Sequence, residues 1–218
     1  MRKIALLLIL CISSLSCGRI YLRLIGVKQT KAVTKNELTS FLNKHQLNPT
    51  IVLELDSAKY AALIEAKKRD TLTYKSPDWW IQNHVQPVQV IYYDNKEQKP
   101  LAAYFNCIAE GRGLTNFTWN KNHELDTFPP KTYTDWRWRD TLFTMNEIVS
   151  TFHAFGDEPF LMDNYNKRYQ IFVFYSLFIE KQSNNLIQEV NTHINKFIKS
   201  EADIHYINMD NYFYHAMK

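Results

Sequence analysis

The feature that most constrains the fold is a strand, a helix and a second strand in the last quarter of the chain. Residues 171–175 (IFVFY) form an unbroken apolar run, which is typical of a strand covered on both faces of a sheet. Apolar side chains then recur at helical spacing over 184–199, and residues 204–209 (IHYINM) predict another strand. Because a unit of this size forms a right-handed parallel crossover, the sequence predicts an α/β domain. The helical stripe consists of Leu186, Ile187, Val190, Ile194, Phe197 and Ile198.

The first third of the chain predicts further helices and strands. Leu38, Phe41 and Leu42 are at helical spacing within 36–46, and Asn36 is available as the N-cap of that helix. The sequence then predicts a strand at 50–55 and a helix at 58–68 that is capped by Asp56 or Ser57.

The middle of the chain predicts a hairpin followed by a long connection. Residues 88–93 (VQVIYY) and 101–105 (LAAYF) are strand-like and are separated by the short polar loop 94–100, which favours antiparallel pairing. Residues 106–142 have no helical period, and a connection of this length is uncommon unless it is functional. We expect a single domain at 35–218 that contains this irregular connection.

The composition excludes several classes of protein. The 218 residues are 45% hydrophobic and 14% aromatic, enough to fill a core, so wholesale disorder is excluded. Three Cys residues are too few for a disulfide-dense scaffold, and a formal net charge of +4 gives no argument for a nucleic-acid partner.

The N-terminus has the pattern of an export signal. Basic residues Arg2 and Lys3 precede the apolar run 4–12, which is about half the ~20 residues needed to span a bilayer. We therefore interpret residues 1–16 as a signal peptide. Removing these residues leaves 202, and loss of Arg2 and Lys3 lowers the net charge from +4 to +2.

The small residues directly before Cys17 resemble the lipobox of bacterial lipoproteins, although Ser14 stands where the lipobox usually has Leu. The resemblance implies cleavage before Cys17, diacylation of its sulfur and acylation of the new amino group with fatty acids such as palmitate. Ordinary signal cleavage that leaves Cys17 free is the alternative. Two or more acyl chains would anchor the protein essentially permanently.

The segment after the anchor is basic. We expect residues 17–34 to form a lipid-anchored tether near the membrane surface. No acidic run follows Cys17, which favours the periplasmic leaflet of the outer membrane over export to the cell surface.

Two segments resemble thioredoxin-like proteins. Residues 174–182 (FYSLFIEKQ) are similar to the segment that carries the Cys-x-x-Cys active site, and 207–210 (INMD) is similar to the end of the next strand of that family. Residues 85–94 (VQPVQVIYYD) are similar to the segment that opens with a cis-proline, a position held by Pro87. These segments occur in the reverse of the family's order, so the pattern is either permuted or built on a duplicated half. The order of lipobox, basic tether, hairpin and degenerate thioredoxin motif along the chain also resembles small lipoproteins of the Bacteroidetes.

The resemblance fails at the reactive residues. Ile179 and Gln182 occupy the positions of the two cysteines, so dithiol exchange cannot run. Together with Phe178 and Pro87, they form a relic of the thioredoxin active site. Outside the signal and the lipobox, the remaining cysteine is Cys107, either a buried apolar residue or a single reactive thiol.

Other patterns for chemistry are weak. The seven His residues show no zinc-ligand spacing, and no nucleophile elbow or phosphate loop is present, so we expect no metal, no cofactor and no enzyme activity. Trp136, Arg137 and Trp138 could stack on a sugar or a peptide. Alternatively, these side chains and Trp119 cover the core.

The sequence therefore predicts a cell-envelope lipoprotein whose non-redox thioredoxin-like domain is a binding or scaffolding module. Its partners are the membrane, through the lipid, and an unknown protein, peptide or glycan. The alternatives are glycan or peptide binding by the Trp/Arg-rich connection and a single-thiol protein centred on Cys107.

Overall fold

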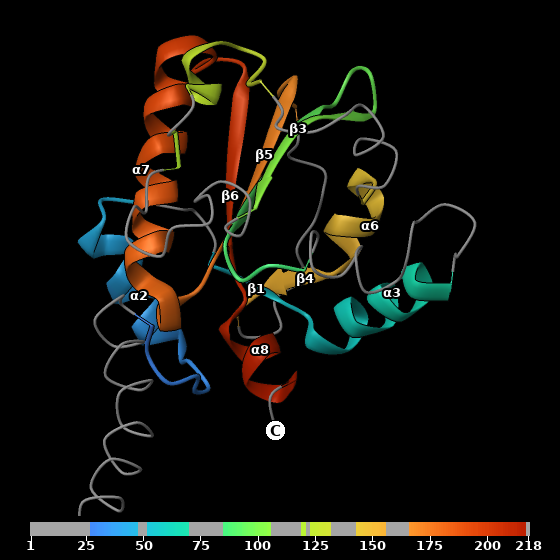
Figure 1. Cartoon of the computed structure of the whole chain (residues 1–218), viewed down its shortest axis with the longest axis vertical. Coiled ribbons are helices and arrows are strands. Elements are labelled where there is room, and N and C mark those ends of the chain that lie inside the picture. The colour runs from blue at the N-terminus through green and yellow to red at the C-terminus, as the bar shows by residue number, and fades with distance from the viewer. Residues whose placement is uncertain are drawn as a thin grey trace, which may run out of the picture.

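The computed structural model describes residues 27–47, 52–69, 85–105, 119–120, 123–131, 143–155 and 166–216. Within these ranges the chain forms a mixed six-stranded sheet in the order β3-β2-β5-β6-β1-β4, with helices on both faces (Figure 1). The predicted α/β class is therefore confirmed. The strands are β1 Leu53–Leu55, β2 Gln89–Asp94, β3 Lys99–Phe105, β4 Phe152–Ala154, β5 Tyr169–Tyr175 and β6 Ala202–Asn208.

Strand β5 lies at the centre of the sheet, as its apolar sequence predicts. It pairs antiparallel with β2 and parallel with β6, and all seven of its residues are buried. The expected hairpin is also present, because β2 and β3 pair antiparallel. Helix α7 (Glu180–Phe197) connects β5 to β6, which confirms the parallel strand-helix-strand unit.

Two apolar layers cover the sheet. Helices α2 (Lys35–Lys44) and α7 pack on one face, and α3 (Ser57–Arg69) and α6 (Met145–Ser150) pack on the other (Figure 1). Helix α8 (Asp210–Ala216) follows β6 at one end of the sheet. Of the apolar stripe on α7, only Phe197 is exposed, at 36%. No helix within the described ranges is long and apolar enough to cross a membrane.

The helix starts correct two details of the sequence interpretation. Thr34, not Asn36, caps α2, because the Thr34 hydroxyl accepts from the Glu37 amide while the Glu37 carboxylate accepts from the Thr34 amide at 2.9 Å. Asp56 caps α3 as expected, since it accepts from the amides of Ala58 and Lys59. Helix α7 begins four residues before the predicted start at 184.

The described part of the 106–142 connection packs against α7. Trp119 is 1% exposed and donates from Nε1 to the Gln182 carbonyl at 3.0 Å. This tryptophan therefore covers the core, which is one of the two roles considered for the aromatic residues of the connection. A 3-10 turn, η1 (Glu124–Asp126), follows. The sequence interpretation missed the short elements α6 and β4 beyond it, as well as α8.

Residues 27–34, which we expected to belong to a separate tether, lie against the domain. Val33 is 5% exposed, and its amide donates to Asn211 Oδ1 at 2.9 Å. The Lys28 amide donates to the Phe178 carbonyl at 2.6 Å. We call residues 27–34 the strap. This part of the expected tether is therefore part of the folded body.

Candidate functional site

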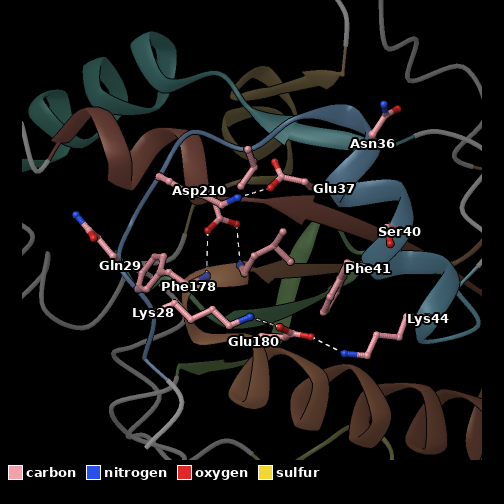
Figure 2. Close-up of a pocket in the computed structure, with 13 residues that line it drawn as sticks. Lys28, Gln29, Asn36, Glu37, Ser40, Phe41, Lys44, Phe178, Glu180 and Asp210 are labelled. Atoms are coloured by element: carbon pink, nitrogen blue, oxygen red, sulfur yellow. Dashed lines mark hydrogen bonds and ion pairs between the residues drawn. The ribbon is translucent and has the colours of Figure 1, made fainter. Parts of the chain in front are cut away.

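A hollow of about 500 Å³ lies at the end of the sheet where β5 ends (Figure 2). Four segments that are distant in sequence form its walls: the strap, α2, the 3-10 turn η4 (Leu177–Ile179) with the start of α7, and the start of α8. Its lining residues are Lys28, Gln29, Lys31, Val33, Asn36, Glu37, Ser40, Phe41, Lys44, Leu177, Phe178, Glu180 and Asp210. The volume is within the range of small-ligand sites.

The Asp210 carboxylate fixes the turn at the base of the hollow. Asp210 is 2% exposed and accepts hydrogen bonds from the amides of Leu177 (2.8 Å) and Phe178 (3.2 Å). The same carboxylate accepts from Ser176 Oγ at 2.7 Å and from Asn208 Nδ2 at 2.6 Å. Four donors therefore compensate for burial of the charge. Since these bonds occupy the carboxylate, we assign Asp210 to holding the turn.

Glu180 joins the strap to α2 across the mouth of the hollow. Its carboxylate pairs with Lys28 from the strap and with Lys44 from α2, the latter at 2.8 Å (Figure 2). Hydrogen bonds from Lys28 and then Lys44 lower the pKa of Glu180 to about 2. Two ammonium groups therefore share one carboxylate. Both lysine side chains stay more than half exposed and retain N–H donors for a further anion.

The strap and α2 carry a second ion pair. Lys31 pairs with Glu37, which also closes the capping box of α2. The bond from Lys31 and those from Thr34 lower the pKa of Glu37 to about 2. This carboxylate is therefore ionised at neutral pH and is already paired.

Aromatic side chains form the apolar wall. Phe41 stacks on Tyr175, with ring centroids 5.2 Å apart and 9° between the planes. Phe178 contacts Phe213 of α8 edge-on at 5.8 Å. The Tyr175 hydroxyl is buried and has no hydrogen-bond partner among the described residues, and burial raises the pKa of this group. The hollow therefore combines an apolar interior with a charged rim.

The structure separates the predicted relic residues. Phe178 lines the hollow, whereas Ile179 is 5% exposed within the core and Gln182 is 7% exposed, on the first turn of α7. Pro87 lies two residues before β2, whose Gln89 pairs with Phe174, so it is close to the end of β5. The Gln86–Pro87 bond is trans, so the expected cis-proline is wrong.

Four other predicted groups lie outside the described residues: Cys17, Cys107, the Trp136-Arg137-Trp138 run and most of the 106–142 connection. Their roles stay predictions.

Sequence reasoning missed Lys28, Lys44 and Glu180. The two lysines are 152 and 136 positions from the glutamate, and no local pattern predicts contacts across such separations. Asp210 is the last residue of the segment 207–210 (INMD). Its position directly after β6, within the segment that resembles a thioredoxin-like strand end, is the signal that could have placed it near the turn.

The described side chains around the hollow supply ammonium groups and apolar surface. The described residues contain no group of three or more His, Cys, Asp or Glu side chains that could hold a metal ion. Ser176 Oγ donates to Asp210 and is buried, and none of the described histidines lines the hollow beside Ser40. The rim offers ammonium donors, and the interior offers apolar contact.

Comparisons of the chain with protein-family models, curated proteins and solved structures find no match.

Proposed function

We propose that the protein is a cell-envelope lipoprotein whose domain is a non-redox, thioredoxin-like binding module, and that the hollow is its ligand site. The observation that carries the proposal is the position of the hollow. It lies at the turn from β5 into α7, where the resemblance puts the active site of thioredoxin-like proteins.

Strand order supports the thioredoxin-like part of the proposal. Strands β3 and β2 form a hairpin, and β2 pairs antiparallel with β5. Strand β6 pairs parallel with β5 and is joined to it through α7. A mixed sheet flanked by helices is the architecture that the resemblance implies. The hairpin precedes the strand-helix-strand unit in the chain, which agrees with a permuted order.

The residues at the turn support a non-redox role. Ile179 packs in the core, and Gln182 is buried at the first turn of α7, so neither position offers a thiol to a disulfide. Purified protein should therefore reduce insulin disulfides no faster than buffer with the same dithiothreitol. Reduction at the rate of a true dithiol enzyme would contradict the non-redox assignment.

The walls of the hollow indicate the class of ligand. Lys28 and Lys44 share one carboxylate and stand at the rim, while Phe41 and Phe178 line the interior. A ligand with an anionic group attached to an apolar body satisfies both parts, because the anion meets the ammoniums and the body displaces water from the aromatic wall. A peptide segment with an acidic and an apolar side chain has this chemistry.

Anilinonaphthalene sulfonate is a suitable first probe, since it carries a sulfonate on an aromatic body. We expect saturable fluorescence enhancement with the wild-type protein. Ser40→Trp should abolish it, because Ser40 is exposed on α2 and lines the hollow. Asn43→Trp is the matched control, since Asn43 is exposed on the same helix and does not line the hollow.

Circular dichroism of both variants tests that α2 remains folded. Equal binding by wild type and Ser40→Trp would place the dye elsewhere and contradict the hollow as the ligand site.

A further inference from the structure

We propose that the end of the domain that contains the hollow faces the membrane, and that its exposed lysines contact anionic lipid headgroups. The inference rests on the proposed lipidation of Cys17. It goes further by giving the domain one orientation and a lipid surface as a second binding partner.

The strap fixes the point at which the chain leaves the body. Main-chain and side-chain bonds attach Lys28 to the turn at Phe178 and attach Val33 to Asn211, so both attachments lie at the same end of the sheet. Lys28 is eleven residues from Cys17. At no more than ~3.6 Å per residue in a fully extended chain, this length allows at most about 40 Å between them.

That reach is comparable with the size of the domain itself, since a body of about 180 residues has a radius of gyration of about 16 Å. For the opposite end to lie on the membrane, the connecting residues would have to run almost fully extended around the body. The end with the hollow can approach the bilayer without this entropic cost.

The exposed charge at this end suits an anionic surface. The strap, α2 and the first residue of α7 together carry four exposed lysines and two carboxylates, those of Glu37 and Glu180, so these segments contribute a net charge of +2. The lysines are Lys28, Lys31, Lys35 and Lys44. Such charges act only within about 8 Å of a surface at physiological salt, and an acyl anchor would hold them there.

Aromatic side chains lie at the same end. Helices α8 and α2 lie at the same end of the body (Figure 1), and Tyr214 of α8 is half-buried there, whereas Tyr212 and Phe213 pack against the core. Tyrosine suits the headgroup region because its ring is apolar and its hydroxyl is polar. Lysine with tyrosine is therefore the combination that a lipid interface favours.

The opposite end provides an internal reference. The β2–β3 turn, residues 95–98, follows Asp94, which pairs with Tyr169 at the start of β5. The hollow lies beyond Tyr175 at the other end of the same strand. Labels at the two ends therefore report orientation directly.

The test uses the mature, acylated protein with Cys107→Ser as the background, reconstituted in vesicles of phosphatidylcholine with about 30% phosphatidylglycerol. A fluorophore is attached at Ser40→Cys or at Glu97→Cys, and lipids with nitroxide headgroups quench it. We expect quenching at position 40 to be about threefold stronger than at position 97. The difference should shrink in pure phosphatidylcholine or in about 0.5 M salt, which screens the charges.

Lys35→Glu is the charge variant, because Lys35 is exposed, lies outside the hollow and begins α2, where an acidic residue suits the helix dipole. It should reduce quenching at position 40, whereas the same change at Lys99, on the hairpin, should not.

Mass spectrometry of the acylated N-terminus separates the two proposals. An acylated protein with equal quenching at both positions overturns the orientation. Quenching at position 40 that is indifferent to Lys35→Glu and to phosphatidylglycerol overturns the contact of the lysines with anionic lipid. The anchor stands in both cases. A protein without acyl groups overturns the anchor and the orientation together.

Discussion

At the scale of single residues, the site depends most on Asp210. Its buried carboxylate accepts four hydrogen bonds, two of them from the backbone of the turn that forms the base of the hollow. In Asp210→Asn, an amide NH₂ replaces one carboxylate oxygen and faces N–H donors. We expect a loss of about 2–3 kcal/mol in the free energy of unfolding, measured by urea denaturation.

Glu97→Gln is the control, because Glu97 is exposed in the β2–β3 turn and this change should stay within about 0.5 kcal/mol. An Asp210→Asn protein as stable as the control would show that the carboxylate does not hold the turn.

Residue types alone do not predict this site. Local patterns limited the cap of α3 to Asp56 or Ser57, because a cap bonds to amides two and three positions away, and Asp56 is the cap observed. The contact of Glu180 with Lys28 depends on how the chain folds back on itself, and no property of the residues near either position indicates the partner. Sequence could therefore locate the turn at 177–180 but not the strap that crosses it.

At the scale of elements, strands and amphipathic helices were predictable because the periods of buried side chains determine them. Strand β5 and helix α7 agree with their patterns, except that α7 starts at Glu180 after a 3-10 turn. The short elements α6 and β4 were missed, since six and three residues are too few to show a period. The start of α2 was misplaced because Asn36 is as good an N-cap by type as Thr34.

The two candidate caps of α2 are separable by mutation. Thr34→Ala should lower the free energy of unfolding by about 1 kcal/mol, since it removes an acceptor for the Glu37 amide. Asn36→Ala should be neutral or slightly stabilising, because alanine is the better helix former. Urea denaturation of the two variants side by side decides between them, and a larger loss for Asn36→Ala would contradict the observed cap.

Helix α7 should make stability depend on pH through His193. Its Nδ1 is 3.2 Å from the Tyr92 hydroxyl and its Nε2 is 3.0 Å from the Thr127 carbonyl, an arrangement that the neutral ring satisfies by accepting at Nδ1 and donating at Nε2. Burial lowers the pKa of His193 below the ordinary 6.5. The unfolded chain therefore takes up the proton first as the pH falls.

The sign of the effect follows from this order. The contribution of His193 is fully present above about pH 6.5 and is lost as the pH falls towards its lowered pKa. Burial also lowers the pKa of His205, to about 4, so both histidines make the wild type less stable as the pH falls. His193→Gln should remove part of the slope between pH 6.5 and 5, at most about 1.4 kcal/mol per pH unit. The measurement is urea denaturation of both proteins at several pH values. If the free energy of unfolding depends on pH in His193→Gln as it does in the wild type, His193 is not responsible.

At the scale of the whole molecule, the proposed anchor and the strap act together. The strap is bonded to the body at Lys28 and Val33, so a lipid on Cys17 would hold the domain close to the bilayer rather than on a free tether. Cys17→Ala should move the protein from the membrane to the soluble fraction, or leave an uncleaved precursor, as judged by fractionation and immunoblotting. Normal maturation with full membrane retention would contradict lipidation.

The central claim is that the hollow binds an anion through Lys28 and Lys44 and an apolar body through its aromatic wall. The most direct test compares anilinonaphthalene sulfonate with N-phenylnaphthylamine, which has the same aromatic body without the sulfonate. In the Lys28→Gln/Lys44→Gln variant, we expect dye titrations to give a dissociation constant about fivefold weaker for the sulfonate, or roughly 1 kcal/mol, and unchanged for the neutral dye. Equal changes for the two dyes, or none for either, would contradict the claim.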